Sequence, residues 1–335
     1  MRVVAIGRTD ILYNSILEIA KAGHEIVIII TSQHSQYQYS KDIEDFRNLS
    51  KKLGSEFFLT DNLTSSDIVT RLKQYKPDIG ISVNWNTLIP EKIMDIFTYG
   101  ILNAHAGDLP RYRGNAVRNW AIVSGENQIS LTIHQMEAGL DSGPIVMKKY
   151  FPIQSKTHIG ALYNFVNKNT PTLFVKSING LADGSIIPEP QNQDRSLRCY
   201  PRLPIDSHID WNKTAEEIDR VVRASSEPFT GAYSFMDGEK ITIWKSSVKK
   251  ETGEYLAKPG QVIDRDSKSG GVSIATGKDF LLIQDAETSK NGRTEPTKII
   301  NTIRKRLGID YSNEIIELRR RLSILEENLS EKKEE

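Results

Sequence analysis

The first part of the chain alternates short apolar runs with segments of helical length. Residues 3–6 and 25–31 are apolar and rich in β-branched side chains, and residues 11–20 between them end near a helix-stopping Gly23. Continuous apolar runs of this kind are typical of parallel strands buried on both faces. A strand, helix, strand order predicts a right-handed βαβ unit.

The same alternation continues as far as residue 136. We expect further strands at residues 56–59, 79–83, 100–105 and 129–136, with a helix over residues 66–75. The pattern therefore predicts an α/β domain with an open, mostly parallel, Rossmann-like sheet over residues 1–187.

A proline-rich stretch follows this domain. Four prolines lie between positions 188 and 204, and proline both blocks helices and removes backbone donors. Residues 188–206 are therefore predicted to be a connector. Beyond it, a helix at 214–224 and short strands around an Asp-Gly hairpin signal predict a helix plus a small OB-like β-barrel over residues 207–290.

The end of the chain has a helical pattern. Between positions 315 and 329, isoleucine and leucine recur in steps of 3, 4, 3 and 4 among charged residues. This heptad pattern predicts a helical tail over residues 297–335. The tail either packs on its own chain or pairs with a second copy, and we predict a homodimer formed through this helix.

Composition narrows the class of protein. Of 335 residues, 38% are hydrophobic and 26% are charged, which fits a globular protein with its own core. Lys and Arg number 44 against 43 Asp and Glu, so the net charge of +1 argues against a protein that mainly neutralises nucleic-acid phosphates. The most apolar run, residues 26–30, is too short for a membrane span and no signal peptide is recognisable, so we expect a cytoplasmic protein.

The sequence gives little support for a metal or a redox cofactor. Cys199 is the single cysteine of the chain, which excludes a disulfide framework and a cysteine-based zinc site. The six histidines lack the spacing of a metal site. The turn at Gly7 lacks the second and third glycines of the dinucleotide-binding fingerprint. We therefore predict no metal and no nicotinamide or flavin cofactor.

Three polar residues stand at the ends of expected strands. Asn103 and His105 are two positions apart in the strand at 100–105, so their side chains share one face. The carboxyl ends of such strands are where open α/β sheets bind ligands. Asp141 lies in a turn bracketed by glycines, directly after the strand at 129–136. An amide, an imidazole and a carboxylate are therefore candidates for a catalytic site.

These residues belong to a run of motifs that resembles the folate-dependent formyltransferases. The motifs are Asn-x-His at 103–105, Leu-Pro-x-Tyr-Arg-Gly at 109–114, Trp-Ala-Ile at 120–122 and Leu-Asp-Ser-Gly at 140–143. The family includes methionyl-tRNA formyltransferase, glycinamide ribonucleotide formyltransferase and the sugar-nucleotide N-formyltransferases, and the resemblance spans roughly residues 1–285. It implies N10-formyltetrahydrofolate as the formyl donor and an amine as the acceptor.

The resemblance also implies roles for individual residues. His105 is expected to act as general base or proton shuttle, because histidine titrates near neutral pH. Asn103 is expected to donate a hydrogen bond to the developing oxyanion, and Asp141 to orient His105. The backbone at six further residues is expected to line the folate site: Asn84, Trp85, Asn86, Ala138, Gly139 and Leu140.

Three features favour a sugar-nucleotide acceptor. Residues 103–110 resemble the Asn-x-His-x-Gly-x-Leu-Pro form of the sugar enzymes, His134 matches a histidine frequent in them, and residues 209–233 resemble the region that joins the two domains of the bacterial aminoarabinose enzyme. We therefore predict formylation of a 4-amino-4,6-dideoxy sugar carried on UDP, dTDP or GDP, for a surface or flagellar glycan. Arg111 and Arg113 are expected to contact its diphosphate.

Other functions stay open at this point. A methionyl-tRNA formyltransferase would need a basic face on the barrel, but the lysines between positions 245 and 258 are diluted by Glu251 and Glu254. A non-catalytic binding or dimerisation relative is disfavoured by the three intact candidate catalytic residues. A formyltetrahydrofolate hydrolase is a lesser alternative.

Overall fold

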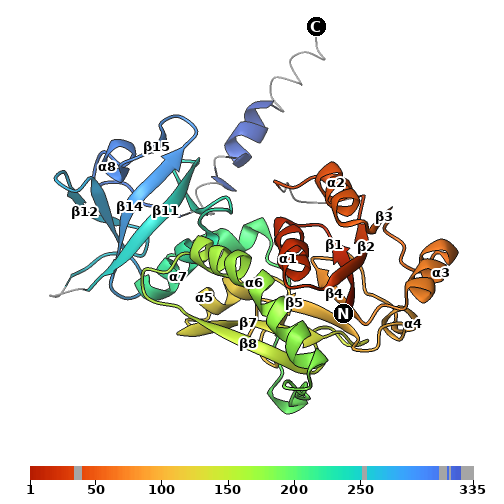
Figure 1. Ribbon diagram of the computed structural model, residues 1–335. Coiled ribbons are helices and arrows are strands. Elements are labelled where there is room, and N and C mark those ends of the chain that lie inside the picture. The colour runs from red at the N-terminus through yellow and green to blue at the C-terminus, as the bar shows by residue number, and fades with distance from the viewer. Residues whose placement is uncertain (34–39, 251–254, 309–314, 317, 326–335) are drawn as a thin grey trace, which may run out of the picture. The chain divides into compact units, whose positions relative to one another are not determined.

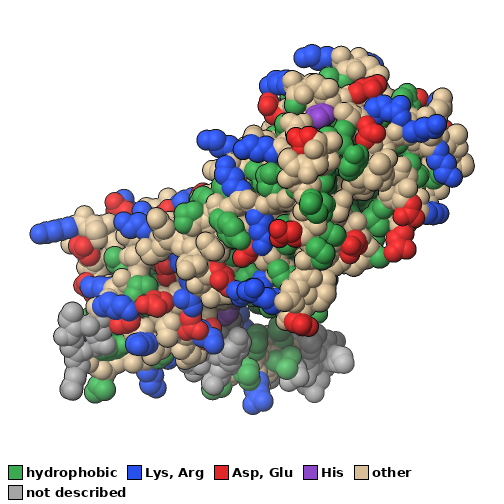
Figure 2. Space-filling view, turned by 60° about the horizontal axis from the view of Figure 1, so that its bottom comes forward, with side chains coloured by type: hydrophobic (Ala, Val, Ile, Leu, Met, Phe, Trp, Pro, Cys, Tyr) green, Lys and Arg blue, Asp and Glu red, His purple; other side chains and the backbone are tan. Residues whose placement is uncertain are grey.

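The computed structural model of this chain describes residues 1–33, 40–250, 255–308, 315–316 and 318–325 (Figure 1). The chain divides into two compact units, Met1–Arg202 and Leu203–Glu335. The domain limits expected from the sequence, at residues 187, 206 and 290, stay predictions. Basic and acidic side chains are interspersed over the molecular face shown in Figure 2.

The N-terminal unit is built on a seven-stranded sheet. Its strands are, in spatial order, β3 (Glu56–Leu59), β2 (Glu25–Thr31), β1 (Arg2–Gly7), β4 (Ile79–Val83), β5 (Ile101–His105), β7 (Gln128–Gln135) and β8 (Ile145–Pro152). The first five are parallel, whereas β7 and β8 pair antiparallel. The expected open, mostly parallel α/β sheet is confirmed.

The pattern of the sequence does not predict β8. This strand lies at the edge of the sheet, and of its eight residues only Val146 is buried. Lys148 and Lys149 stand at its centre. An edge strand with such residues shows no continuous apolar run, so its pattern cannot be recognised as that of a strand.

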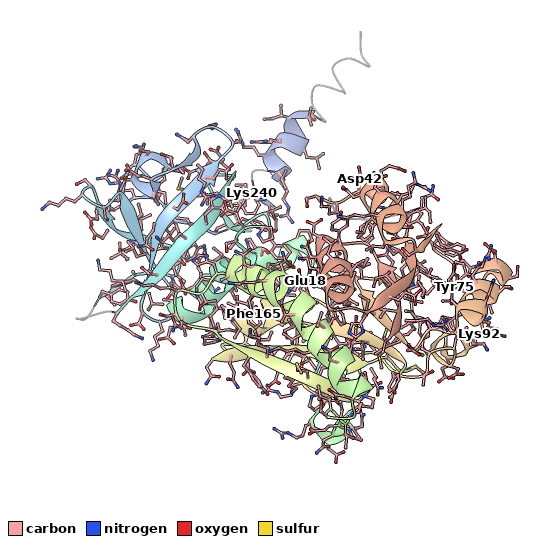
Figure 3. All side chains as sticks on the ribbon, viewed as in Figure 1. Glu18, Asp42, Tyr75, Lys92, Phe165 and Lys240 are labelled. Atoms are coloured by element: carbon pink, nitrogen blue, oxygen red, sulfur yellow. The ribbon has the colours of Figure 1, made fainter. Side chains whose placement is uncertain are left out.

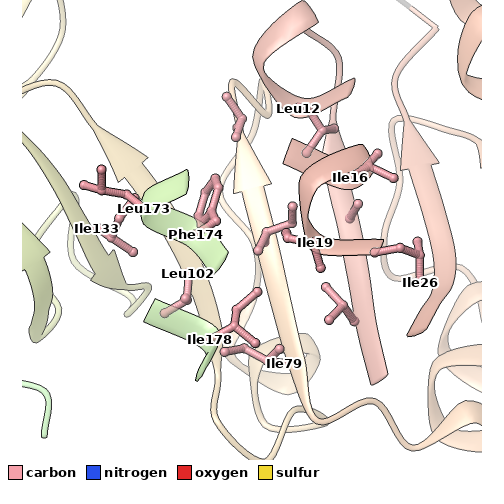
Figure 4. Close-up of a cluster of buried hydrophobic side chains, with 14 of the residues drawn as sticks. Leu12, Ile16, Ile19, Ile26, Ile79, Leu102, Ile133, Leu173, Phe174 and Ile178 are labelled. Atoms are coloured by element: carbon pink, nitrogen blue, oxygen red, sulfur yellow. The ribbon is translucent and has the colours of Figure 1, made fainter. Parts of the chain in front are cut away.

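Helices cover one face of the sheet with a large apolar cluster. This face is covered by α1 (Asp10–Lys21) and by the long helix α6 (Ile159–Ala182). Figure 4 shows the side chains that meet there, which include Leu12, Ile16 and Ile19 of α1 and Leu173, Phe174 and Ile178 of α6. A second cluster joins alternate residues of the central strands to α3 (Ser66–Tyr75) and α4 (Glu91–Met94). Burial on both faces explains the continuous apolar runs of the central strands.

Two further helices belong to this unit, α2 (Ile43–Leu53) and α5 (Val117–Val123). Within the described part of the chain, no helix combines the length and the apolarity needed to cross a bilayer. A cytoplasmic location stays a prediction.

The expected connector is folded against the N-terminal unit. Its strand β9 (Arg198–Cys199) pairs with β6 (Arg113–Gly114) in a two-stranded parallel sheet, and Glu189 forms an isolated bridge with Ile145. Short 3₁₀ turns lie at Gln193–Arg195 and Pro204–Ser207. Burial raises the pKa of Cys199 to about 11, so this thiol is protonated and unreactive at neutral pH.

The C-terminal unit is an antiparallel sheet with one main helix. The strands run in the order β10 (Ala232–Met236), β11 (Glu239–Lys249), β14 (Phe280–Thr288), β13 (Gly271–Ala275) and β12 (Val262–Asp266), with β15 (Gly292–Thr294) beside β14. Helix α7 (Ala215–Ser225) contributes Ile218 and Val222 to the core. Asp237 and Gly238 both have left-handed backbone angles, as a tight hairpin between β10 and β11 requires. The expected succession of an α/β sheet, a small β unit and a C-terminal helix is confirmed.

The tail differs from its predicted extent of residues 297–335. A short helix, α8 (Pro296–Ile299), is followed by non-helical residues up to 308, because Ile300 and Leu307 are buried in the core of the C-terminal unit. Helical residues are then described at 315–316 and 318–325. The last leucine of the heptad pattern, Leu329, lies outside the described residues.

Candidate active site

Asn103 and His105 lie at the carboxyl end of β5, in the middle of the sheet. They are two residues apart on one strand and therefore face the same side. On the neighbouring antiparallel strand β7, the residues opposite them are His134 and Thr132. His105 is buried, with 7% of its surface exposed. Strand pairing therefore brings an amide and two imidazoles together.

The hydrogen bonds of His105 define which of its nitrogens can accept a proton. Its Nε2 lies 2.6 Å from the backbone carbonyl of Tyr112. A carbonyl only accepts, so Nε2 carries the hydrogen and Nδ1 has the lone pair in the neutral ring. Nδ1 lies 3.5 Å from Oδ2 of Asp141. Burial lowers the pKa of His105, while the charge of Asp141 partly opposes that shift. The ring is therefore a neutral base at pH 7.

Asp141 is held as a carboxylate. Its Oδ2 accepts the backbone N–H of Gly114 at 2.8 Å, and its own backbone is left-handed, with a φ of 48°. Burial raises the pKa of Asp141, but its polar neighbours, among them His105 and the Gly114 N–H, lower it to about 2. A negative charge is thereby fixed beside Nδ1 of His105, where it stabilises the imidazolium formed by proton uptake.

His134 is a fourth member of the site. Its Nδ1 lies 2.8 Å from the Gln135 carbonyl, which fixes the hydrogen on Nδ1. Nε2 therefore accepts from the amide nitrogen of Asn103, at 3.2 Å, and it lies 3.7 Å from Oδ1 of Asp141. From the sequence, His134 stood out only as part of a resemblance. Its position opposite Asn103 on a paired strand is the signal that places it in the site.

The loop after β5 is held in place by side chains of the neighbouring strands β7 and β8. The carbonyl of Gly107 accepts hydroxyl groups of Ser130 and Thr132, at 3.1 and 2.8 Å. The loop turns back so closely that a Cβ at Gly107 would lie 2.5 Å from Nε2 of His105. Lys148 pairs with Asp108 at 2.7 Å. These contacts hold the carbonyl of Tyr112 where it can fix the tautomer of His105.

Gln191, from the expected connector, also supports the site. Its amide nitrogen donates to the carbonyls of Asp141 and Gly143, at 2.8 and 2.7 Å. Its oxygen accepts from the guanidinium of Arg113, and Gln193 accepts from the same group at 2.8 Å. A single glutamine in a proline-rich stretch carries no sequence signal, so sequence reasoning missed it.

The two arginines expected to bind a diphosphate have partners within the chain. Arg111 forms an ion pair with Glu126 at 2.8 Å and is half exposed. Arg113 is bonded to Gln191 and Gln193. Their role in substrate binding stays a prediction.

The six residues expected at the folate site lie in two loops. Asn84, Trp85 and Asn86 follow β4, and Ala138, Gly139 and Leu140 lie in the turn before Asp141.

An apolar cluster adjoins both of these loops. Trp85 and Met136 pack against the same cluster. A pocket of about 390 Å³ is lined by the apolar Met94, Phe97 and Met136 together with the polar Asp95, Gln135 and Glu137. The indole nitrogen of Trp85 is buried without a hydrogen-bond partner. A pocket lined by both apolar and polar side chains fits a flat, polar-edged ring system.

Within the described residues, no group of three or more histidine, cysteine, aspartate or glutamate side chains is arranged to hold a metal ion.

Comparison with known proteins identifies the family. The model of the family described as "Formyl transferase" matches residues 1–178, and that of "Formyl transferase, C-terminal domain" matches residues 204–318. The chain belongs to the formyl transferase family. The resemblance seen in the sequence motifs and the prediction of a formyltransferase enzyme are thereby confirmed.

Two relatives of this chain are methionyl-tRNA formyltransferases by name. A methionyl-tRNA formyltransferase of Clostridium beijerinckii is 36% identical over 218 residues, which cover 65% of this chain and 69% of the relative. A methionyl-tRNA formyltransferase of Lachnospira eligens is 27% identical over 300 residues, or 88% of this chain and 94% of the relative.

Solved structures share the fold of this formyltransferase. A sugar 3N-formyl transferase, WlaRD, superposes with a TM-score of 0.65 at 20% identity and covers 87% of this chain and 98% of its own. An N-formyltransferase from Helicobacter canadensis has a TM-score of 0.62 at 19% identity, over 84% of this chain and 98% of its own. At this level of identity the similarity concerns the fold alone.

The prediction of a sugar-nucleotide acceptor is wrong. Eight curated relatives, up to 36% identical, are all methionyl-tRNA formyltransferases, whereas the sugar enzymes match as folds. Because these relatives are named for methionyl-tRNA, the balanced charge of this chain does not exclude a nucleic-acid partner. The prediction that the product enters a surface or flagellar glycan depended on the sugar acceptor, so it is withdrawn too.

The contacts of the three features explain why they misled. Within residues 103–110, Gly107 and Asp108 brace the catalytic loop. His134 orients Asn103. Within residues 209–233, Ile209 and Trp211 are buried in the core of the C-terminal unit. Each of these residues is held by contacts within the chain, so its presence does not identify the acceptor.

Proposed function

We propose that this formyltransferase transfers a formyl group from N10-formyltetrahydrofolate to the amino group of methionyl-tRNA. The observation that carries the proposal is the agreement of curated relatives, at up to 36% identity, on methionyl-tRNA formylation. Support from the site is the intact arrangement of Asn103, His105 and Asp141, which provides a base and an oxyanion donor for acyl transfer to an amine.

Each catalytic side chain has a defined task in this proposal. The donor, when bound, supplies an electrophilic formyl carbon. His105 takes, at Nδ1, the proton that the attacking amine loses as its nitrogen bonds to the formyl carbon, and the adjacent Asp141 stabilises the resulting imidazolium. The imidazolium returns this proton to the folate nitrogen as the bond between that nitrogen and the formyl carbon breaks. Asn103 gives one amide hydrogen to His134 and directs the other at the formyl oxygen, where negative charge develops. Burial of His105 excludes water that would compete with the amine.

The residues present fit a folate donor. The pocket beside Met94, Phe97 and Met136 combines these apolar side chains with Asp95, Gln135 and Glu137, a lining that suits the faces and the polar edge of an aromatic ring system. Trp85 has an indole N–H that lacks a partner and can donate to a ring acceptor. Sugar formyltransferase WlaRD was crystallised with 5-N-formyl-THF, which supports a reduced folate as the donor of this chain too.

The outer face of the C-terminal sheet supports an RNA acceptor. Tyr233 and Phe235 of β10 lie opposite Thr242 and Lys240 of β11, on the side away from the core. The ammonium of Lys240, labelled in Figure 3, lies 4.5 Å from the centre of the Tyr233 ring. Aromatic rings combined with cations on a β surface are typical of proteins that stack unpaired bases.

The same outer face also carries Trp244 of β11 and Arg293 of β15. Arg293 lies 4.8 Å from the ring centre of Trp244, whose indole N–H donates to Glu287 at 2.7 Å. We define the "aromatic face" as Tyr233, Phe235, Lys240, Trp244 and Arg293.

We also propose a homodimer formed through the C-terminal helix. The apolar residues of the heptad pattern that the structure describes, Ile315, Leu318, Leu322 and Leu325, are each about half exposed. Half-exposed leucines at heptad spacing are the surface that a second helix covers in a coiled coil.

A single assay tests the proposed function. The protein is incubated with N10-formyltetrahydrofolate and charged initiator methionyl-tRNA, and release of tetrahydrofolate is followed. We expect turnover with the charged tRNA and none with uncharged tRNA, which lacks the amine. Equal release without any acceptor would identify a hydrolase, and release with UDP-, dTDP- or GDP-linked amino sugars in place of tRNA would overturn the proposal.

A further inference from the structure

One arginine near the catalytic residues is not used by the mechanism. Three other cations around the site are bonded within the chain: Arg111 to Glu126, Arg113 to Gln191, and Lys148 to Asp108. Arg118, at the start of α5, differs from them. Among the residues that the structure describes, no carboxylate lies within ion-pair distance of its guanidinium.

The guanidinium of Arg118 is stacked on an aromatic ring. Its central carbon lies 3.5 Å from the ring centre of Tyr163 in α6, and the two side chains are also hydrogen-bonded. Stacking occupies one face of the guanidinium plane, and Tyr163 takes one of its five N–H groups. The plane is therefore fixed in orientation while most of its donors are available.

The buried guanidinium of Arg118 would be stabilised by a negative charge beside it. Burial lowers the pKa of Arg118, so its surroundings disfavour the charged state, yet arginine keeps its charge at any physiological pH. Buried charges in proteins are ordinarily paired, because an unpaired one loses its hydration without compensation. Since no carboxylate of the described residues pairs with Arg118, a bound anion would supply the missing counter-charge.

The position of Arg118 relates it to the reaction. Arg118 is the second residue of α5, which begins three residues after Gly114, and its charge contributes to lowering the pKa of His105. The turn before α5 carries Gly114, which donates to Asp141. An anion bound by Arg118 would thus be held at a fixed distance from the base that deprotonates the acceptor amine, and such fixed placement accelerates a bimolecular reaction.

We propose that Arg118 binds a phosphate of the acceptor substrate and so places the acceptor amine at His105. The proposal rests on the proposed function in one respect: with methionyl-tRNA as acceptor, the anions available are phosphodiesters near its 3′ end. The formyl donor carries carboxylates and is the second possible source of an anion. The experiment below separates these two sources.

The first measurement is independent of formyl transfer. Inorganic phosphate is titrated into the unmodified protein and into Arg118→Gln by calorimetry. A matched control is Arg47→Gln, because Arg47 also stacks on an aromatic ring, 4.7 Å from the centre of Phe57, but is paired with Glu44. We expect saturable binding in the unmodified protein and in Arg47→Gln, with loss in Arg118→Gln. Arg118→Lys keeps the charge and is expected to retain weakened binding.

The second measurement identifies the source of the anion. In steady-state assays, Arg118→Gln is expected to raise the KM for methionyl-tRNA about tenfold or more, while the KM for the donor changes less than twofold. The slope of log KM for the tRNA against log salt concentration should fall by about 0.7 to 0.9, as expected for one lost phosphate contact. A raised KM for the donor alone would overturn the assignment to the acceptor.

The outcomes also separate this proposal from the proposed function. If methionyl-tRNA is not formylated but phosphate binding depends on Arg118, the acceptor is a different phosphate-bearing amine and the anion site stands. If methionyl-tRNA is formylated with an unchanged KM and salt slope in Arg118→Gln, the function stands and the anion site is refuted. If Arg118→Gln unfolds, Arg118→Lys decides, since it must still bind phosphate for the proposal to hold.

Discussion

Nε2 of His134 lies 3.2 Å from the amide nitrogen of Asn103, its partner across the β5–β7 strand pair. The Gln135 carbonyl fixes the proton on the other nitrogen of this ring, so Nε2 is an acceptor. The Asn103 amide is thereby oriented before substrate arrives. A pre-oriented donor is worth more to an oxyanion than one that must first rotate into place.

His134→Phe is expected to lower kcat by about 3- to 10-fold, because Asn103 loses the bond that orients it. The KM for the donor should change little, since the interaction acts in the transition state. His134→Gln offers an amide oxygen to Asn103 and should recover most of the rate. His24→Phe, at a half-exposed histidine outside the site, is the control. A recovery no better for Gln than for Phe would contradict the positioning role.

His105→Asn is expected to leave the circular dichroism spectrum unchanged and to lower turnover by about 10²-fold or more, as loss of a general base does. In the unmodified enzyme, kcat/KM should fall on the acid side as His105 becomes protonated. Because burial lowers the pKa of His105, the midpoint of this limb should lie below 6.5.

The variant Asp141→Asn tests whether His105 is the group that titrates in this pH profile. The charge of Asp141 raises the pKa of His105, so its removal should move the acid limb to a still lower pH while reducing the maximal rate. An acid limb that moves upward instead would show that a different group titrates.

Gln191→Ala is expected to lower the free energy of unfolding by about 1–3 kcal/mol, because the carbonyls of Asp141 and Gly143 lose their donor in a buried position. Turnover should fall as well, since the turn that carries Asp141 is loosened. Urea denaturation and the formylation assay measure the two effects. Gln193→Ala, at an exposed neighbour, should stay within about 0.5 kcal/mol of the unmodified protein.

Tyr233→Ala and Phe235→Ala are expected to weaken binding of a fluorescent single-stranded RNA, each by about fivefold or more, because a stacked base loses its ring. A duplex of the same composition should be affected far less, because its bases are already stacked. Tyr150→Ala is the control, since Tyr150 is an exposed aromatic residue of the N-terminal unit. Equal losses for the single strand and the duplex would rule out base stacking on the aromatic face.

Truncation after Asp310 is expected to reduce the mass in light scattering from that of a dimer to that of a monomer. Leu318→Asp combined with Leu322→Asp should do the same in the full chain, because two half-exposed leucines of the heptad pattern become charged. An unchanged mass in both proteins would show that the helix does not mediate dimerisation.

Much of the fold could be predicted from the sequence because the central strands are buried on both faces. Val4 and Ile28 face the second cluster while Val3 and Ile29 face the first, so the run of apolar residues is unbroken. Edge strand β8 lacks that constraint and gave no pattern. The tail was predicted too long because the residues up to 308, though part of the C-terminal core, have no distinctive periodicity.

The candidate catalytic residues were predictable for a different reason. Asn103 and His105 share a strand, and their spacing alone puts them on one face. His134 and Gln191 reach the site through strand pairing and through a folded connector, which are long-range contacts that a linear pattern does not encode. The acceptor was predicted wrongly because the motif around Gly107 reflects the close packing of its loop against His105, and this packing carries no information about the acceptor.

The bonds of Gln191 have a consequence for exchanging parts between enzymes of this family. The segment that links the two units braces the turn of Asp141 with one side chain, and Tyr200 accepts the indole N–H of Trp120 at 2.8 Å. A chimera that joins this catalytic unit to a foreign C-terminal unit should therefore keep its own chain through Tyr200. A crossover placed earlier, at the first proline of the linker, would transplant part of the active site along with the appended unit.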